Sequence, residues 1–121
     1  MKITVKNNEF FVNLLDFETA KAYEDGAERL TKLAGELEPI PKLSDQITKG
    51  CEAIADVIDS VLGEGATEKL FNGRKALDEY AQTWFEITQK ISKGAKKDQD
   101  ASQRALAQLK ANQLKAKKSH A

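Results

Sequence analysis

The first fourteen residues alternate apolar and polar side chains in two short stretches. The apolar positions are Ile3 and Val5 in the first stretch, then Phe10, Val12 and Leu14 in the second. Alternation with a period of two is typical of half-buried β-strands. Asn7-Asn8 stands between the stretches, and asparagine tolerates the positive φ angles of a tight turn. The segment therefore predicts a β-hairpin.

After the hairpin the apolar residues recur three or four positions apart, which is the spacing of an amphipathic helix. The first such stripe comprises Ala20, Tyr23, Ala27, Leu30, Ala34 and Leu37. It predicts a helix over about residues 17–37, with Asp16 or Thr19 as the N-terminal cap and Pro39 beyond its end.

Two further stripes predict two further long helices. One begins at Ser44 and covers about residues 44–62, with Ile47, Cys51, Ile54, Ile58 and Val61 on its apolar face. The other comprises Leu77, Tyr80, Trp84, Thr88 and Ile91, flanked by Ala81 and Phe85. Residues 66–71 between them predict one or two helical turns. We expect a mainly α protein, in which an N-terminal β-hairpin precedes a compact domain of three to four helices.

Glycine residues mark weak points and ends in this pattern. Gly26 and Gly35 each weaken the first helix by about 1 kcal/mol relative to alanine, so packing has to hold it. Gly63-Glu64-Gly65 differs from a phosphate-binding loop, which needs four residues between its glycines and a strand before them. We expect Gly63 to adopt the left-handed conformation at a helix end and Gly65 to permit a sharp entry into the next helix.

The composition changes at Gly94, and we divide the chain into a domain over residues 1–93 and a tail over residues 94–121. Between Ala95 and Ala121 the large apolar residues are Leu106, Leu109 and Leu114. That is too little apolar surface to hold the tail in the domain. Alanine and glutamine favour helix, so we expect a polar, basic tail that is partly helical and becomes ordered on a partner.

A net charge of zero conceals opposite charges in the two parts of the chain. Residues 1–91 contain 11 Lys and Arg against 17 Asp and Glu, a net charge of −6, whereas residues 92–121 contain 8 against 2, a net charge of +6. This asymmetry favours an electrostatically steered contact with another molecule or self-association. The apolar runs are too short for a membrane span or a signal peptide, and Cys51 has no second cysteine with which to pair. We expect a cytoplasmic protein.

The residues available for chemistry do not form a catalytic or metal-binding set. His120 is next to the last residue, where a fixed geometry for acid–base catalysis is hard to maintain, and Cys51 is expected in the core. Glu52, Asp56 and Asp59 line one helix face, but without the spacing of a calcium-binding loop. We therefore expect no enzyme, no cofactor and no metal site.

Two groups of residues are candidates for partner binding. Adjacent helix positions differ by about 100°, so Trp84 and Phe85 cannot both point into the core, and one of them is expected to reach a groove. The tail supplies the cations Lys93, Lys96, Lys97, Arg104, Lys110, Lys115, Lys117 and Lys118. No aromatic residue for base stacking and no nucleic-acid recognition motif accompanies them, so we do not expect nucleic acid to be the main partner.

The chain also resembles a known family in three segments. They are Leu15–Glu24 at the start of the first helix, Ile47–Leu62 with its single cysteine, and Leu62–Gly73, which reads Leu-Gly-Glu-Gly-Ala-Thr-Glu-Lys-Leu-Phe-Asn-Gly. Residues 1–91 resemble the tail assembly chaperones of long-tailed phages and prophages of Gram-positive bacteria. That family commonly has Phe before the first glycine and Gly-Gly at the end of the last segment, where this chain has Leu62 and Asn72.

The resemblance implies a cytoplasmic helper in viral tail morphogenesis. Such a protein coats the tape measure protein, recruits tail tube subunits and is then displaced. We assign the helix contact to Tyr80, Trp84 and Phe85. The second contact is assigned to the tail cations, here Lys96, Lys97, Arg104, Lys110, Lys115, Lys117 and Lys118. Two alternatives stay open: a structural virion protein that completes the tail or connects it to the head as a closed ring, and a nucleic-acid-binding accessory protein.

Overall fold

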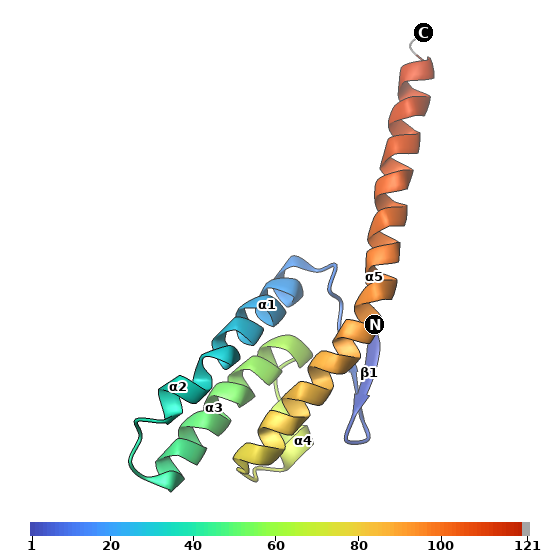
Figure 1. Cartoon of the computed structure of the whole chain (residues 1–121). Coiled ribbons are helices and arrows are strands. Elements are labelled where there is room, and N and C mark those ends of the chain that lie inside the picture. Colours follow the sequence, from blue (N-terminus) through green and yellow to red (C-terminus); the bar gives the residue numbers. More distant parts are fainter. Residues whose placement is uncertain (120–121) are drawn as a thin grey trace.

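The computed structural model describes the backbone of residues 1–119 and the side chains of residues 1–97 and 99–112. The elements are, in chain order, β1 (Lys2–Val5), β2 (Asn8–Phe11), α1 (Phe17–Thr31), α2 (Leu33–Leu37), α3 (Leu43–Leu62), α4 (Ala66–Phe71) and α5 (Leu77–Ser119). Helix α3 packs against α1, α2, α4 and α5, and the hairpin lies against α5 (Figure 1). The prediction of a mainly helical protein with an N-terminal hairpin is confirmed.

The hairpin forms with a different turn from the one predicted. Val5 stands opposite Asn8 and Ile3 opposite Phe10, so the turn consists of Lys6 and Asn7. Both turn residues have positive φ angles, 49° and 64°, as a two-residue hairpin turn of the primed type requires. The predicted Asn7-Asn8 turn is therefore displaced by one residue, and Asn8 belongs to the second strand.

The predicted helix over residues 17–37 is broken at Lys32. Asp16 caps α1, since its Oδ2 accepts hydrogen bonds from the backbone N–H and the hydroxyl of Thr19 (3.1 and 3.0 Å). At the other end the N–H of Lys32 bonds to the Arg29 carbonyl at 3.2 Å, which tightens the last turn. The helical phase changes there, so that Leu33 is buried and Ala34, which the stripe placed inside, is exposed.

Helix α3 is the central element of the core. It begins at Leu43, one residue before the predicted start at Ser44, and Lys42 occupies the cap position without a side-chain hydrogen bond. Its buried face carries Cys51, Ile54, Ile58 and Val61, as predicted, together with Val57. Gly26 of α1 faces Val57 so closely that a Cβ at Gly26 would lie 2.5 Å from Val57 Cγ1. This glycine weakens its helix but allows α1 to approach α3.

The glycine-bounded segment between α3 and α4 is a structural turn. Gly63 has a positive φ of 111° with a ψ of 155°, a region open almost only to glycine but outside the left-handed helical region that we predicted, whereas Gly65 is left-handed with a φ of 83°. Asp59 Oδ1 accepts a hydrogen bond from the Thr67 backbone N–H at 2.8 Å, and the Thr67 hydroxyl donates to the Ala55 carbonyl at 3.2 Å. These bonds attach the start of α4 to α3.

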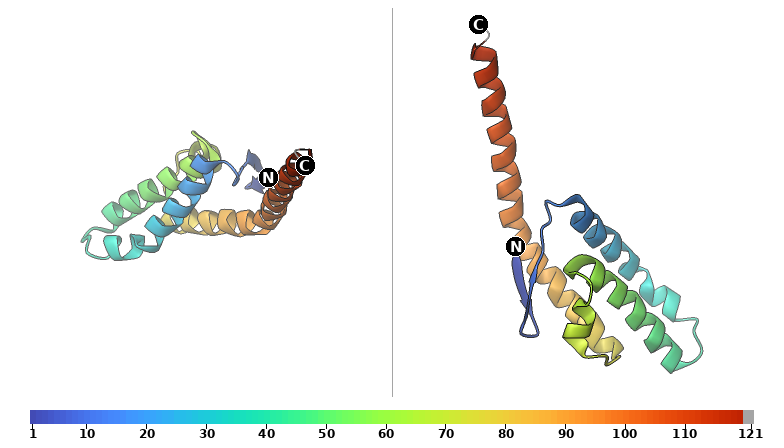
Figure 2. Two further views of the ribbon diagram at one scale, coloured as in Figure 1. Left: turned by 90° about the horizontal axis from the view of Figure 1, so that it is seen from above. Right: turned by 180° about the vertical axis from the view of Figure 1, so that it is seen from behind.

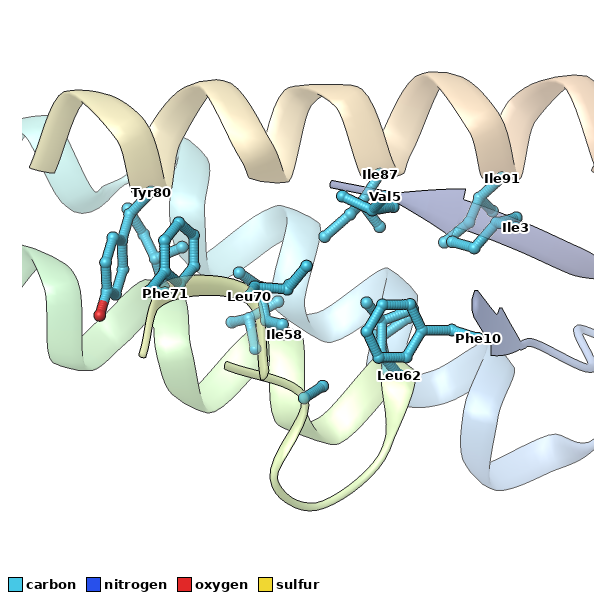
Figure 3. Packing of buried hydrophobic residues seen from close by; sticks show 14 of the residues in the cluster. Ile3, Val5, Phe10, Ile58, Leu62, Leu70, Phe71, Tyr80, Ile87 and Ile91 are labelled. Atoms are coloured by element: carbon cyan, nitrogen blue, oxygen red, sulfur yellow. The ribbon is translucent and has the colours of Figure 1, made fainter. Parts of the chain in front are cut away.

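Helix α5 begins within the packed part of the molecule, residues 1–94, here called the body, and extends beyond it. Ile87 and Ile91 are buried against Val5 and Ile3 of the hairpin (Figure 3). The helix then continues past Gly94, where the lack of a side chain makes room for Met1. Residues 95–119, here called the projecting half of α5, point away from the other elements, and the axis changes direction where they begin (Figures 1 and 2). The predicted tail is thus helical as far as Ser119, and the division at residues 93 and 94 falls within one helix.

Candidate binding surfaces

The structure places Tyr80 in the core. Its side chain is 4% exposed and stacks on Phe71 with ring centroids 3.9 Å apart (Figure 3). The hydroxyl donates to the Arg74 carbonyl at 2.8 Å, and burial raises the pKa of Tyr80. A side chain held in this way is not accessible to a partner, so the assignment of Tyr80 to a helix contact was wrong.

Trp84 and Phe85 diverge, as their adjacent positions on α5 require. Trp84 is half-buried and lies next to Tyr23, with ring centroids 6.2 Å apart. Phe85 is 62% exposed on the outer side of the helix. One ring therefore supports the packing between α5 and α1, and the other is presented to solvent.

Trp84 also forms one wall of an apolar groove. Helices α1, α2 and α5 all pack on α3, and a groove of about 280 Å³ runs between α5 on one side and α2 with the end of α1 on the other. Its lining residues are Leu30, Leu33, Ala34, Leu37, Ile54, Leu77, Ala81 and Trp84. We call this surface the helix groove. Its lining carries no charged side chain, which suits it to an apolar partner.

A second hollow lies where α5 leaves the body. It has a volume of about 310 Å³ and is lined by Leu14, Leu15, Ala20, Tyr23, Glu24, Ala95, Gln99 and Ser102. We call it the corner notch, because the chain turns there from the hairpin into α1. Sequence reasoning missed this surface, because Leu15 stands outside the predicted apolar stripes and was not among the candidate binding residues.

The predicted cations lie along one side of α5, at its exit from the body and on its projecting half. Lys96, Lys97, Arg104 and Lys110 are exposed. Lys115, Lys117 and Lys118 belong to α5 by their backbone, but their side chains lie outside the described residues. Lys97 also lines a cleft of about 600 Å³ between β1 and α5, together with Lys2, Lys90 and Lys93.

Two of the three carboxylates singled out on α3, Asp56 and Asp59, have structural partners. Asp56 pairs with Arg29 at 3.7 Å, and Asp59 holds the start of α4. Within residues 1–97 and 99–112, no group of three or more His, Cys, Asp or Glu side chains is arranged to hold a metal ion. His120 lies outside the described residues. None of the helices in the described part of the chain combines the length and apolar character that crossing a membrane requires.

Cys51 is buried on α3, and desolvation by burial raises the pKa of its thiol. We expect the folded protein to react with a thiol reagent at pH 8 at least about 100-fold more slowly than the protein in urea. Absorbance of the released chromophore measures both rates. Because the folded pKa is raised, stability should also decline above about pH 9, where the unfolded thiol ionises. Equal labelling rates would contradict the buried position.

Comparison with known proteins adds one finding to this geometry. Neither the curated proteins nor the solved structures contain a match to the chain. A family model, described as a family of unknown function (DUF6673), matches residues 6–120. The match covers the body, except for strand β1, together with the projecting half of α5. By this match over most of its length, the chain belongs to the DUF6673 family.

Proposed function

We propose that this protein is a tail assembly chaperone of a long-tailed phage or prophage, which binds the tape measure protein in the cytoplasm of a Gram-positive host. In this role it has no catalytic activity and helps to recruit tail tube subunits. The single observation that carries the proposal is the helix groove, with Trp84 in its wall and Phe85 beside it. The resemblance of Leu62–Gly73 to the chaperone family supports it.

The groove has the properties of a receptor for an amphipathic helix. It lies above α3, between α5 and the consecutive helices α1 and α2, and leucine, isoleucine, alanine and tryptophan side chains line it. A partner helix inserts apolar residues spaced three or four apart into such a groove. A tape measure protein is long and helical, so it offers this pattern repeatedly along its length.

The exposed cations of the projecting half provide the second contact. At about 100° per residue, Lys96, Lys97, Arg104 and Lys110 fall on one half of the helix surface, so they form a basic face that attracts an acidic partner. We assign to them the recruitment of tail tube subunits. Lys115, Lys117 and Lys118 extend this basic segment in the sequence.

A pull-down after coexpression with tape measure segments tests the helix contact. Ala81→Glu places a charge in the groove from an exposed position, and Phe85→Ala removes the exposed ring. We expect each change to reduce the retained segment about fivefold or more, because burying an unpaired charge or losing an aromatic contact costs more than 1 kcal/mol. Trp84→Ala should act in the same direction.

Phe11→Ala is the matched control, since Phe11 is an exposed ring on β2, an element that contributes no residue to the groove, whereas Phe85 stands one helical turn after the groove residue Ala81. Retention that Ala81→Glu and Phe85→Ala leave unchanged would contradict the groove assignment. A closed ring of fixed stoichiometry without any client would instead support a structural virion protein.

The lysine cleft between β1 and α5 favours one alternative, a nucleic-acid-binding accessory protein. Four lysines line it, and Lys93 and Lys97 stand one helical turn apart. In that case DNA affinity should fall steeply with salt and be lost in Lys93→Glu/Lys97→Glu. DNA binding of this kind, without retention of tape measure segments, would replace the chaperone proposal.

A further inference from the structure

We propose that the corner notch is a self-association surface, and that its occupant is the projecting half of α5 from a second copy of this chain. The inference goes beyond the proposed function, because it concerns contacts between copies and needs no client. It is therefore tested on the isolated protein.

The accessible surface of the chain is large for its mass. It amounts to 8500 Å², against about 6500 Å² expected for a compact monomer of 13.4 kDa. The projecting half of α5 accounts for this shape, since it extends away from the body (Figure 1). The excess exceeds the roughly 800 Å² that each partner buries in a standard interface.

Exposed apolar side chains gather around the notch. Leu15 is 55% and Phe17 75% exposed at the corner, and Leu106 is 58% and Leu109 61% exposed on α5. Ser102 lines the notch, and Leu106 and Leu109 follow it at spacings of four and three, so they continue the same helix face. On α1, Phe17, Ala20 and Glu24 likewise share one face.

The charges around these apolar residues are complementary. The corner carries Asp16, Glu18 and Glu24, of which Glu24 lines the notch. On the helix, exposed Lys110 stands one turn after Leu106 and next to Leu109. The chain as a whole shows the same division of charge, with a net charge of −6 over residues 1–91 and of +6 over residues 92–121. An acidic corner attracts this helix, whereas two basic helices pairing with each other would repel.

The occupant has to come from another copy, and one symmetry satisfies both surfaces. The projecting half points away from its own body, so its distal leucines cannot fill its own notch (Figures 1 and 2). The notch and the helix nevertheless adjoin each other, because Ala95, Gln99 and Ser102 of α5 form one wall of the notch. The notch and the leucine face of α5 therefore belong to one continuous surface. When two copies meet about a two-fold axis, the helix of each can fill the notch of the other. We therefore infer a closed dimer.

Size-exclusion chromatography with light scattering tests the apolar part of this interface. We expect a mass of twice 13.4 kDa at about 100 μM protein and dissociation on dilution. Leu106→Gln/Leu109→Gln should raise the dimer Kd about tenfold or more, because both side chains lose buried apolar contact. Ala107→Gln/Ala111→Gln is the matched control, since it adds glutamine to the opposite side of the same helix and should leave the Kd unchanged.

Charge exchange tests the electrostatic part. Lys110→Glu and Glu18→Lys/Glu24→Lys should each weaken the dimer severalfold at low salt. Mixing the two variants should give a heterodimer that is tighter than the dimer of either variant alone, because both contacts then pair opposite charges. Circular dichroism confirms that each variant keeps its helix content.

Three outcomes would overturn the proposal. They are a mass of 13.4 kDa up to about 0.5 mM, a dimer that the leucine variant leaves unchanged, and assemblies that grow without limit. A monomer whose Leu106 and Leu109 instead retain a tape measure segment would assign the notch to the client. The pull-down of the previous section is independent of all these results.

Discussion

Replacing Ile87 by alanine is expected to lower the free energy of unfolding by about 4 kcal/mol, near the upper end of the range for such changes. Ile87 has no exposed surface, and it lies where α5 meets Val5 of the hairpin (Figure 3). A cavity at this junction has rigid β-branched side chains around it, which relax little. Since a domain of this size has a total stability of about 5–15 kcal/mol, the loss is severe. Urea unfolding followed by Trp84 fluorescence measures it.

Phe85, two residues before Ile87 on the same helix, provides the control. Its ring is larger than the isoleucine side chain, but it is mostly exposed, so Phe85→Ala should change stability by about 0.5 kcal/mol or less. A loss of less than about 1 kcal/mol in Ile87→Ala would show that the hairpin does not pack on α5 as described.

Two glycine-to-alanine substitutions in consecutive helices should have opposite effects. Gly26→Ala is expected to destabilise the protein by about 1–2 kcal/mol, because the added Cβ would meet Val57 Cγ1 at 2.5 Å. The valine side chain is short and branched, so it cannot move aside as a long flexible side chain could. Helices α1 and α3 must therefore separate. Gly35→Ala has open space around the new Cβ and should stabilise the protein by about 0.5–1 kcal/mol through helix propensity.

Thermal and urea unfolding of the two variants side by side measure this difference. Each variant serves as the control for the other, because the chemical change is identical. If both substitutions stabilised the protein, α1 would have to lie farther from α3 than described. Gly26 would then affect stability only by weakening its helix.

The sequence pattern predicted the elements of the body but could not decide their local register. In the hairpin, pairing Val5 with Asn8 or with Phe10 places the same apolar side chains on one face, so alternation permits either turn. The break of the helix at Lys32 cannot be predicted from the apolar spacing either, because a tightened turn shifts the helical phase by less than one residue. As a result the stripe favoured Ala34 where the structure buries Leu33.

The candidate site was predicted only in part, for a similar reason. The positions of Tyr80 and Trp84 on the stripe are equivalent by spacing, but Phe71 from α4 covers Tyr80 and leaves Trp84 beside an open groove. Which residue is covered depends on an element that is distant in the sequence. The corner notch is likewise formed by segments about 80 residues apart.

The extent of α5 follows from cooperativity rather than from composition. The segment after Gly94 has too few apolar residues to fold by burial, which led us to expect a tail that is only partly helical. The packed residues from Leu77 to Ile91 already form a nucleus, however, and adding alanine, glutamine and lysine to an existing helix avoids the cost of nucleation. The helix therefore continues to Ser119.

The contact between Gly94 and Met1 lies at the base of the projecting half of α5, so a small rotation there moves the far end of the helix over a large distance. At 1.5 Å per residue, residues 95–119 form an arm about 37 Å long, fixed to the body at one end. Tilting the helix by about 10° at this fulcrum displaces the far end by about 6 Å, more than one helical turn. The position of the distal end is therefore set at its base, by how firmly the hairpin holds α5.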